Sequence, residues 1–202
     1  MKLFYATGTC SLSPHIVLLE TGLPFDVEKV DLATGKTASG ADYLSINPKG
    51  YVPTLQLDSG EYLTEGPAIV QYVADLVPQK RLAPPAGSME RYRLIEWLNF
   101  ISTELHKAFG TLFHQAPQET KQAARETLAK RIAIVDKQLR THEHLAGNQF
   151  SVADAYLFTV LSWARPLKFD LSGWPAVQAY LQRVAARSTV HAAMVAEGLI
   201  KA

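Results

Sequence analysis

The sequence contains only one cysteine, Cys10, among its 202 residues. A single cysteine cannot form an intramolecular disulfide bond, and such chains are typical of reducing compartments, so we expect a cytoplasmic protein. The chain also lacks an apolar run long enough to span a bilayer, and its N-terminus lacks the apolar stretch of a signal peptide. A net charge of +1 gives no electrostatic reason to expect binding to nucleic acid or to an acidic membrane surface.

Internal repeats and low-complexity segments are also missing, and the remaining composition is that of a globular protein. Hydrophobic residues make up 48% of the chain and charged residues 19%, and this length permits one large domain or two small ones. A proline-rich break at residues 78–87 separates two halves of different pattern. We therefore predict a first domain at 1–77, a linker at 78–87 and a second domain at 88–202.

The first domain is expected to be a mixed α/β unit. Leu3-Phe4-Tyr5 and the alternating residues 25–30 are typical of strands, and a helix is expected from His15 to Thr21, with Gly22 as its C-terminal cap. Turn formers at residues 58–61 separate two further short strands and predict a hairpin. The segment 33–41 is expected to be a loop, and Pro67 begins a helix that runs to about residue 76.

Beyond the break, every segment has the spacing of an amphipathic or buried helix, which predicts an all-α domain. Apolar residues recur every three or four positions from Met89 to about Phe113, and again over residues 124–139. Ser151 and Asp154 form an acidic version of a capping box before an apolar run that predicts a buried central helix. Two more helices are expected at residues 175–186 and 190–197.

Cys10 lies in the turn between the first strand and the first helix. The unpaired N–H groups at a helix N-terminus and the helix dipole favour a thiolate over a thiol, so we expect a reactive cysteine with a depressed pKa. The alternative is a small buried side chain, which is the usual role of a free cysteine.

Seven motifs, taken in order and spacing, resemble those of a glutathione transferase of the bacterial beta class. They are Cys10-Ser11-Leu12-Ser13-Pro14-His15, Asn47-Pro48-Lys49-Gly50, Val52-Pro53, Glu65-Gly66-Pro67-Ala68-Ile69, Glu96-Trp97-Leu98-Asn99, Glu104-Leu105-His106-Lys107 and Ala153-Asp154-Ala155-Tyr156-Leu157-Phe158. The resemblance covers nearly the whole chain. It implies a thioredoxin-like N-terminal domain, an all-α C-terminal domain, a homodimer, and glutathione bound between the domains.

The resemblance also implies roles for individual residues. Cys10 and His106 would be catalytic, and the peptide bond between Val52 and Pro53 would be cis, so that the Val52 backbone pairs with the cysteinyl part of glutathione. The full set of residues expected to bind glutathione is Cys10, Lys36, Val52, Pro53, Glu65, Gly66, Asn99, Thr103, Glu104, His106 and Lys107. Many relatives have serine where this chain has Gly66, so one hydroxyl contact to the γ-glutamyl carboxylate is missing.

The activity implied is conjugation of glutathione to hydrophobic electrophiles, together with thiol–disulfide exchange through Cys10. Glutathione would serve as co-substrate, and no metal is implied. Four residues are expected to line the pocket for the electrophile: Phe109, Phe113, Trp163 and Pro166. The alternative from another class is a non-catalytic glutathione-binding or interaction protein of the same fold, which would show a degenerate site.

Overall fold

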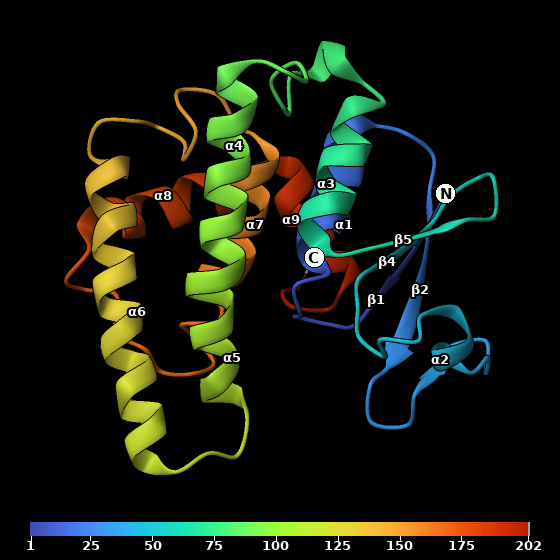
Figure 1. Ribbon diagram of the computed structural model, residues 1–202, viewed down its shortest axis with the longest axis horizontal. Helices are drawn as coiled ribbons and strands as arrows, with labels where there is room; N and C mark the ends of the chain where they lie inside the picture. The colour runs from blue at the N-terminus through green and yellow to red at the C-terminus, as the bar shows by residue number, and fades with distance from the viewer. Residues whose placement is uncertain (202) are drawn as a thin grey trace. The chain divides into compact units, whose positions relative to one another are not determined.

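The computed structural model of the protein describes residues 1–201 and divides the chain into two compact units (Figure 1). The first unit joins Met1–Ala83 to the C-terminal stretch that begins at Arg187, and the second unit is Pro84–Ala186. The division after Ala83 falls inside the expected linker. The last helix, however, belongs to the first unit, whereas the sequence placed it in the helical domain.

A partly buried ion pair between Arg187 and Glu20 joins the last helix to the first helix of the chain. Arg187, just before α9 (Ser188–Ala196), donates through Nε to Glu20 Oε1 at 2.8 Å, and Thr189 adds a hydroxyl bond to the same carboxylate. Glu20 lies near the end of α1 (Leu12–Thr21), which ends at Gly22 with φ of 72°, the left-handed geometry expected of a glycine cap. These contacts attach the end of the chain to its first helix.

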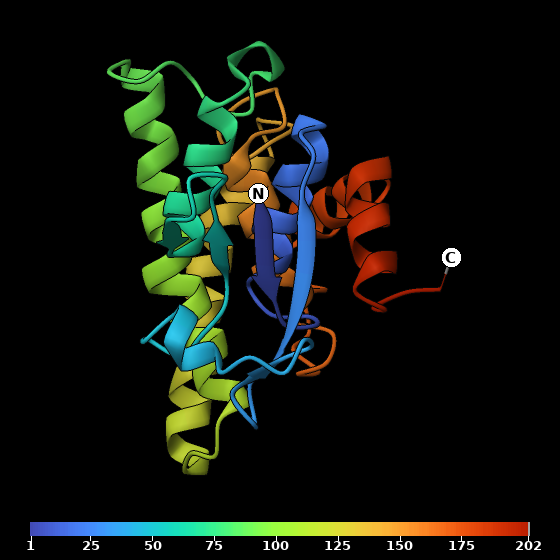
Figure 2. The same ribbon diagram turned by 90° about the vertical axis from the view of Figure 1, so that its right-hand side faces the viewer.

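The first unit is built on a five-stranded sheet with the order β3-β2-β1-β4-β5. Its strands are β1 (Lys2–Tyr5), β2 (Asp26–Asp31), β3 (Lys36–Thr37), β4 (Thr54–Gln56) and β5 (Tyr62–Thr64). Figure 2 shows β1 and β2 side by side; they are parallel, and every other neighbouring pair is antiparallel. The predicted strands and hairpin are confirmed, but β3 lies in the segment that was expected to be a loop.

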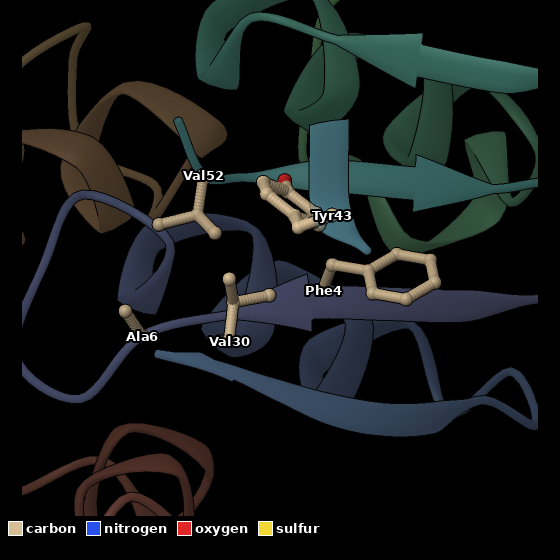
Figure 3. Close-up of a cluster of buried hydrophobic side chains, with 5 residues drawn as sticks. All are labelled: Phe4, Ala6, Val30, Tyr43 and Val52. Atoms are coloured by element: carbon tan, nitrogen blue, oxygen red, sulfur yellow. The ribbon is translucent and has the colours of Figure 1, made fainter. Parts of the chain in front are cut away.

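Both faces of this sheet are covered. Figure 3 shows one face, where Phe4 and Val30 from neighbouring strands meet Tyr43 of the short helix α2 (Tyr43–Ile46). The neighbouring residue Leu3 points to the opposite face, because side chains alternate along a strand, and it is fully buried. On that side α1 packs with α3 (Gly66–Asp75) and α9. The fold of this unit is therefore the expected mixed α/β arrangement.

The second unit is helical, as the sequence predicted. Its helices are α4 (Met89–Phe100), α5 (Lys107–Phe113), α6 (Gln118–Leu139), α7 (Val152–Ser162) and α8 (Pro175–Ala185). The expected single helix from Met89 to Phe113 is two α-helices joined by a wider π-helical turn, Ile101–His106. Such π-helical turns are rare in proteins, and those that occur are often found at functional sites. No helix within residues 1–201 is long and apolar enough to cross a membrane.

Asp154 fixes the start of the buried helix α7. Its Oδ2 accepts hydrogen bonds from the Ser151 backbone N–H at 2.8 Å and from the Ser151 hydroxyl at 2.9 Å, which confirms the capping box. Its Oδ1 accepts from the Leu145 N–H at 2.8 Å and from the Tyr180 hydroxyl at 3.2 Å. The carboxylate is completely buried, so it links the preceding loop, α7 and α8 without help from solvent.

Candidate functional site

The turn that carries Cys10 is fixed by hydrogen bonds to the end of β1. The carbonyl oxygen of Ala6 accepts from the Thr9 N–H at 3.2 Å and from the Thr9 hydroxyl at 2.9 Å. The Ser11 hydroxyl accepts from the Ala6 N–H at 3.2 Å. Gly8 adopts φ of 70°, which a larger residue would resist. The structure therefore places Cys10 between strand and helix, as the sequence predicted.

The Cys10 thiol points back to the sheet side of this turn. It donates a hydrogen bond to the Val52 carbonyl oxygen at 3.3 Å, although 42 residues separate the two in sequence. Burial raises the pKa of Cys10 to about 12, the Glu65 carboxylate adds to the increase, and the N–H groups of Cys10 and Ser11 only partly oppose it. The expectation of a depressed pKa is wrong for the unliganded protein. Desolvation disfavours the Cys10 thiolate more than the N–H groups at the helix N-terminus stabilise it.

The peptide bond between Val52 and Pro53 is cis, which confirms the prediction. The loop before it is held by Asn47, whose Nδ2 donates to the Tyr51 carbonyl oxygen at 2.7 Å. Val52 itself is buried, and its carbonyl is the acceptor for Cys10. Cys10, Val52 and Pro53, expected to act together, therefore meet in the first unit.

Glu65 caps the start of α3 in a backbone conformation that is unusual for a residue with a side chain. Its φ of 69° lies in the left-handed region, and such conformations are concentrated at ligand-binding sites. Its Oε1 accepts from Lys49 Nζ at 2.6 Å and from the Tyr51 hydroxyl at 2.9 Å. These hydrogen bonds raise the pKa of Lys49 and of Tyr51. Sequence reasoning quoted Lys49 within a motif but assigned no role to either residue.

Gly66 follows Glu65 at the first position of α3. A Cβ added there would meet Pro53 Cγ at 3.9 Å, which is ordinary van der Waals contact. A small side chain is therefore compatible with this position. Lys36, the other expected ligand in this unit, is exposed on β3 at the edge of the sheet, and its role stays a prediction.

The other residues that are expected to bind glutathione lie along one continuous stretch of the helical unit. Asn99 lies on α4, Thr103 and Glu104 lie in the π-helical turn, and Lys107 begins α5. The Thr103 hydroxyl donates to the Asn99 carbonyl oxygen at 3.0 Å, and Glu104 Oε2 lies 2.7 Å from Arg131 Nε on α6. Glu104 thus has a structural partner that the sequence did not reveal. The expected ligand contacts of these residues stay predictions.

His106 ends the π-helical turn and is held by aromatic side chains. Its Nδ1 lies 2.7 Å from the Tyr156 hydroxyl, and its ring packs edge-on against Trp163 with centroids 4.8 Å apart. Burial lowers the pKa of His106, and the positive charge of Lys107 lowers it further. Both effects favour the neutral imidazole, which can donate or accept a hydrogen bond, over the cation.

The four residues expected to line an electrophile pocket differ in exposure. Phe109 is completely buried beneath Trp163, so it forms core and cannot contact a co-substrate directly. Phe113 is 51% exposed and packs edge-on against the same tryptophan at 5.7 Å. Pro166 is also exposed. Phe113 and Pro166 therefore remain candidates, whereas Phe109 and Trp163, which is 7% exposed, belong to the buried core.

Comparison with known proteins identifies the family. Residues 7–76 match the family model described as the glutathione S-transferase N-terminal domain, and residues 100–188 match that of the C-terminal domain. The chain is 48% identical over 200 residues to glutathione S-transferase GstA of Escherichia coli O157:H7, covering 98% of this chain and 100% of that protein.

Two solved structures give the same result. A ternary complex of BphK, a bacterial glutathione S-transferase, has a TM-score of 0.97 and 58% identity, covering 98% of this chain and 100% of that one. A sphingomonad glutathione S-transferase complexed with glutathione has a TM-score of 0.95 and 51% identity, covering 99% and 100%. The chain therefore belongs to the glutathione S-transferase family, as its motifs indicated.

Proposed function

We propose that the protein conjugates glutathione to hydrophobic electrophiles. The observation that carries this proposal is the meeting of the Cys10 thiol with the cis Val52–Pro53 backbone, in the unit where Glu65 caps α3. Glutathione offers a matching set of groups. The Val52 backbone would pair with its cysteinyl part, the N-terminus of α3 would receive its γ-glutamyl carboxylate, and Glu65 would accept from its ammonium. The membership of the family and the glutathione complex of a 51% identical relative support this assignment.

In this proposal the Cys10 side chain acts as a neutral donor. Its raised pKa keeps the proton on sulfur at pH 7, so the S–H group can donate to the sulfur of bound glutathione and stabilise that sulfur as a thiolate. The glutathione thiol releases its proton to solvent, and the thiolate that this donor stabilises then attacks the electrophile: a carbon–sulfur bond forms and the leaving group departs with its electron pair. Thiol–disulfide exchange through Cys10 needs its thiolate, which this environment disfavours.

Residues of the helical unit complete the proposal. His106 would donate a hydrogen bond to the same sulfur, and Lys107 would lie near it. Thr103 and Glu104 would contact glutathione, and Asn99 would reach across the dimer to the glutathione of the partner subunit. Lys36 of the first unit would bind the glycyl carboxylate. These contacts rest on the family resemblance and are tested by substitution.

The proposal is tested by retention on glutathione-agarose together with a conjugation assay that uses an activated aryl chloride. Glu65→Gln should weaken glutathione binding about 10- to 100-fold, because it removes a charge-assisted hydrogen bond. Glu61→Gln, which changes another exposed carboxylate, on the hairpin, should leave binding unchanged. Retention without turnover would support the non-catalytic alternative, and neither retention nor turnover would contradict both.

Gly66→Ser should tighten glutathione binding about 5- to 10-fold, because the new hydroxyl can donate to the γ-glutamyl carboxylate. The site accepts the side chain, since the added Cβ would lie 3.9 Å from Pro53 Cγ. Isothermal titration calorimetry measures the change, and Gly66→Ala is the matched control that adds the Cβ without the hydroxyl. Equal affinities for the serine and alanine variants would show that the missing hydroxyl does not limit binding.

We further propose that the protein is a homodimer that uses α4. Met89 and Tyr92 on this helix are 66% and 59% exposed, and the Trp97 and Phe100 rings pack edge-on at 5.7 Å farther along it. Apolar side chains gathered on one helix surface are typical of an interface. Sedimentation velocity at micromolar concentration should give a dimer, and Tyr92→Glu should shift it toward monomer. A fully active monomer in the unaltered protein would contradict the proposal.

A further inference from the structure

The hydrogen bond between His106 and Tyr156 joins two elements of the helical unit. His106 ends the π-helical turn, and Tyr156 lies in the middle of α7 and is almost completely buried. The start of α7 is fixed by the three hydrogen bonds that Asp154 accepts from Ser151 and Leu145, which do not involve Tyr180, so the Tyr156 hydroxyl is held on a rigid support. The His106 ring therefore contacts a positioned hydroxyl group instead of solvent on its Nδ1 side.

The ring of His106 has little freedom to turn. Trp163 packs edge-on against it at 4.8 Å with an interplanar angle of 69°, and Tyr156 packs at 6.0 Å with an angle of 74°. A half-turn of the ring would replace Nδ1 by a carbon at the Tyr156 hydroxyl and would lose the 2.7 Å contact. The arrangement therefore selects one orientation, in which Nδ1 is committed to Tyr156.

The acid–base chemistry of the His106 imidazole and the Tyr156 phenol indicates which ring nitrogen of His106 carries the proton. A neutral imidazole has one N–H donor and one acceptor nitrogen, and a phenol can play either part. The 2.7 Å separation allows a hydrogen bond with either group as donor. A phenol O–H is a stronger acid than the N–H of a neutral imidazole, and an imidazole nitrogen is a stronger base than a phenol oxygen, so the pair favours the Tyr156 hydroxyl as donor and Nδ1 as acceptor, with the ring proton on Nε2.

We propose that Tyr156 is a positioning residue that holds His106 in the Nε2–H tautomer and so makes Nε2–H its hydrogen-bond donor toward an anionic ligand atom. The identity of that atom as the glutathione sulfur rests on the proposed function. The selection of the tautomer rests only on the contacts within the helical unit. Tyr156 itself does not touch the reacting atoms in this scheme.

The tautomer is measured directly by long-range proton–nitrogen NMR on the uniformly labelled, unliganded protein at neutral pH. His106 should show an unprotonated Nδ1 and a protonated Nε2. Tyr156→Phe should move both nitrogens toward averaged values, since the bond that selects the tautomer is lost. Tyr180→Phe is the matched control: it removes another buried hydroxyl of the same unit, one that donates to Asp154, and should leave the His106 signals unchanged.

Steady-state kinetics test whether the tautomer of His106 affects conjugation. In Tyr156→Phe, kcat/KM for conjugation should fall about 5- to 10-fold, the factor of a single hydrogen bond, and its pH profile should shift to higher pH because the bound thiolate loses a donor. Tyr180→Phe should keep the profile of the unaltered protein. A protonated Nδ1 in the unaltered protein, or unchanged nitrogens in Tyr156→Phe, would overturn the inference. The expected NMR result without any conjugation activity would instead contradict the proposed function.

Discussion

Asp154→Ala should be the most destabilising single substitution that we predict, lowering the free energy of unfolding by about 3–5 kcal/mol. An ordinary helix cap is worth about 1 kcal/mol, but this carboxylate is completely buried and accepts four hydrogen bonds. Its removal leaves the N–H groups of Ser151 and Leu145 and the hydroxyl of Tyr180 without this acceptor in a site that water does not reach. Denaturant unfolding followed by circular dichroism measures the loss.

Asp170→Ala is the matched control for this prediction. Asp170 makes the same kind of contact, accepting from the Ser172 N–H at 2.8 Å and from the Ser172 hydroxyl at 2.8 Å, but it is exposed. Solvent can replace these bonds, so the unfolding midpoint should change little. Glutathione affinity of the folded Asp154→Ala protein should also stay near that of the unaltered protein. An unchanged midpoint with weakened glutathione binding would instead place Asp154 in the binding site.

The features that the sequence predicted correctly are those set by neighbouring residues. The capping box depends only on the spacing of Ser151 and Asp154, and the glycine cap depends only on the need for a positive φ at Gly22. The hairpin and the strand-to-helix turn at Cys10 follow in the same way from turn formers and periodicity. Family resemblance supplied what periodicity could not, namely the cis bond before Pro53.

The features that the sequence missed depend on partners that are distant along the chain. The two-residue strand β3 exists because it pairs with β2, and the last helix joins the first unit because Arg187 and Thr189 bind Glu20. The partners Lys49 and Tyr51 of Glu65 show the same limit. No local pattern encodes these contacts, since each is set by how the elements pack.

The pKa of Cys10 is the most consequential of these differences, because two opposing effects had to be weighed. The helix N-terminus and two N–H groups favour the thiolate, and the sequence showed both. Desolvation and the nearby Glu65 carboxylate favour the thiol, and only the folded structure shows how strongly. The sum decides whether Cys10 acts as a nucleophile or as a hydrogen-bond donor.

Cys10 should therefore react very slowly with iodoacetamide at pH 7. With a pKa of about 12, its thiolate fraction at pH 7 is about three-thousandfold below that of a free cysteine, whose pKa is about 8.5. The rate should increase about tenfold per pH unit and continue to increase above pH 9, where an ordinary cysteine has already reached its plateau. Intact-mass spectrometry follows the reaction without ambiguity, since the chain has no other cysteine.

The same chain unfolded in guanidinium chloride is the matched control, because its Cys10 is then fully hydrated and should react as an ordinary thiol. Comparing the two rates at each pH removes the intrinsic reactivity of the reagent. A folded protein that reacts rapidly at pH 7, with a plateau below pH 8, would show that the helix N-terminus outweighs burial after all. Cys10 would then be a nucleophile suited to thiol–disulfide exchange, and its proposed part as a neutral donor to the glutathione sulfur would be wrong.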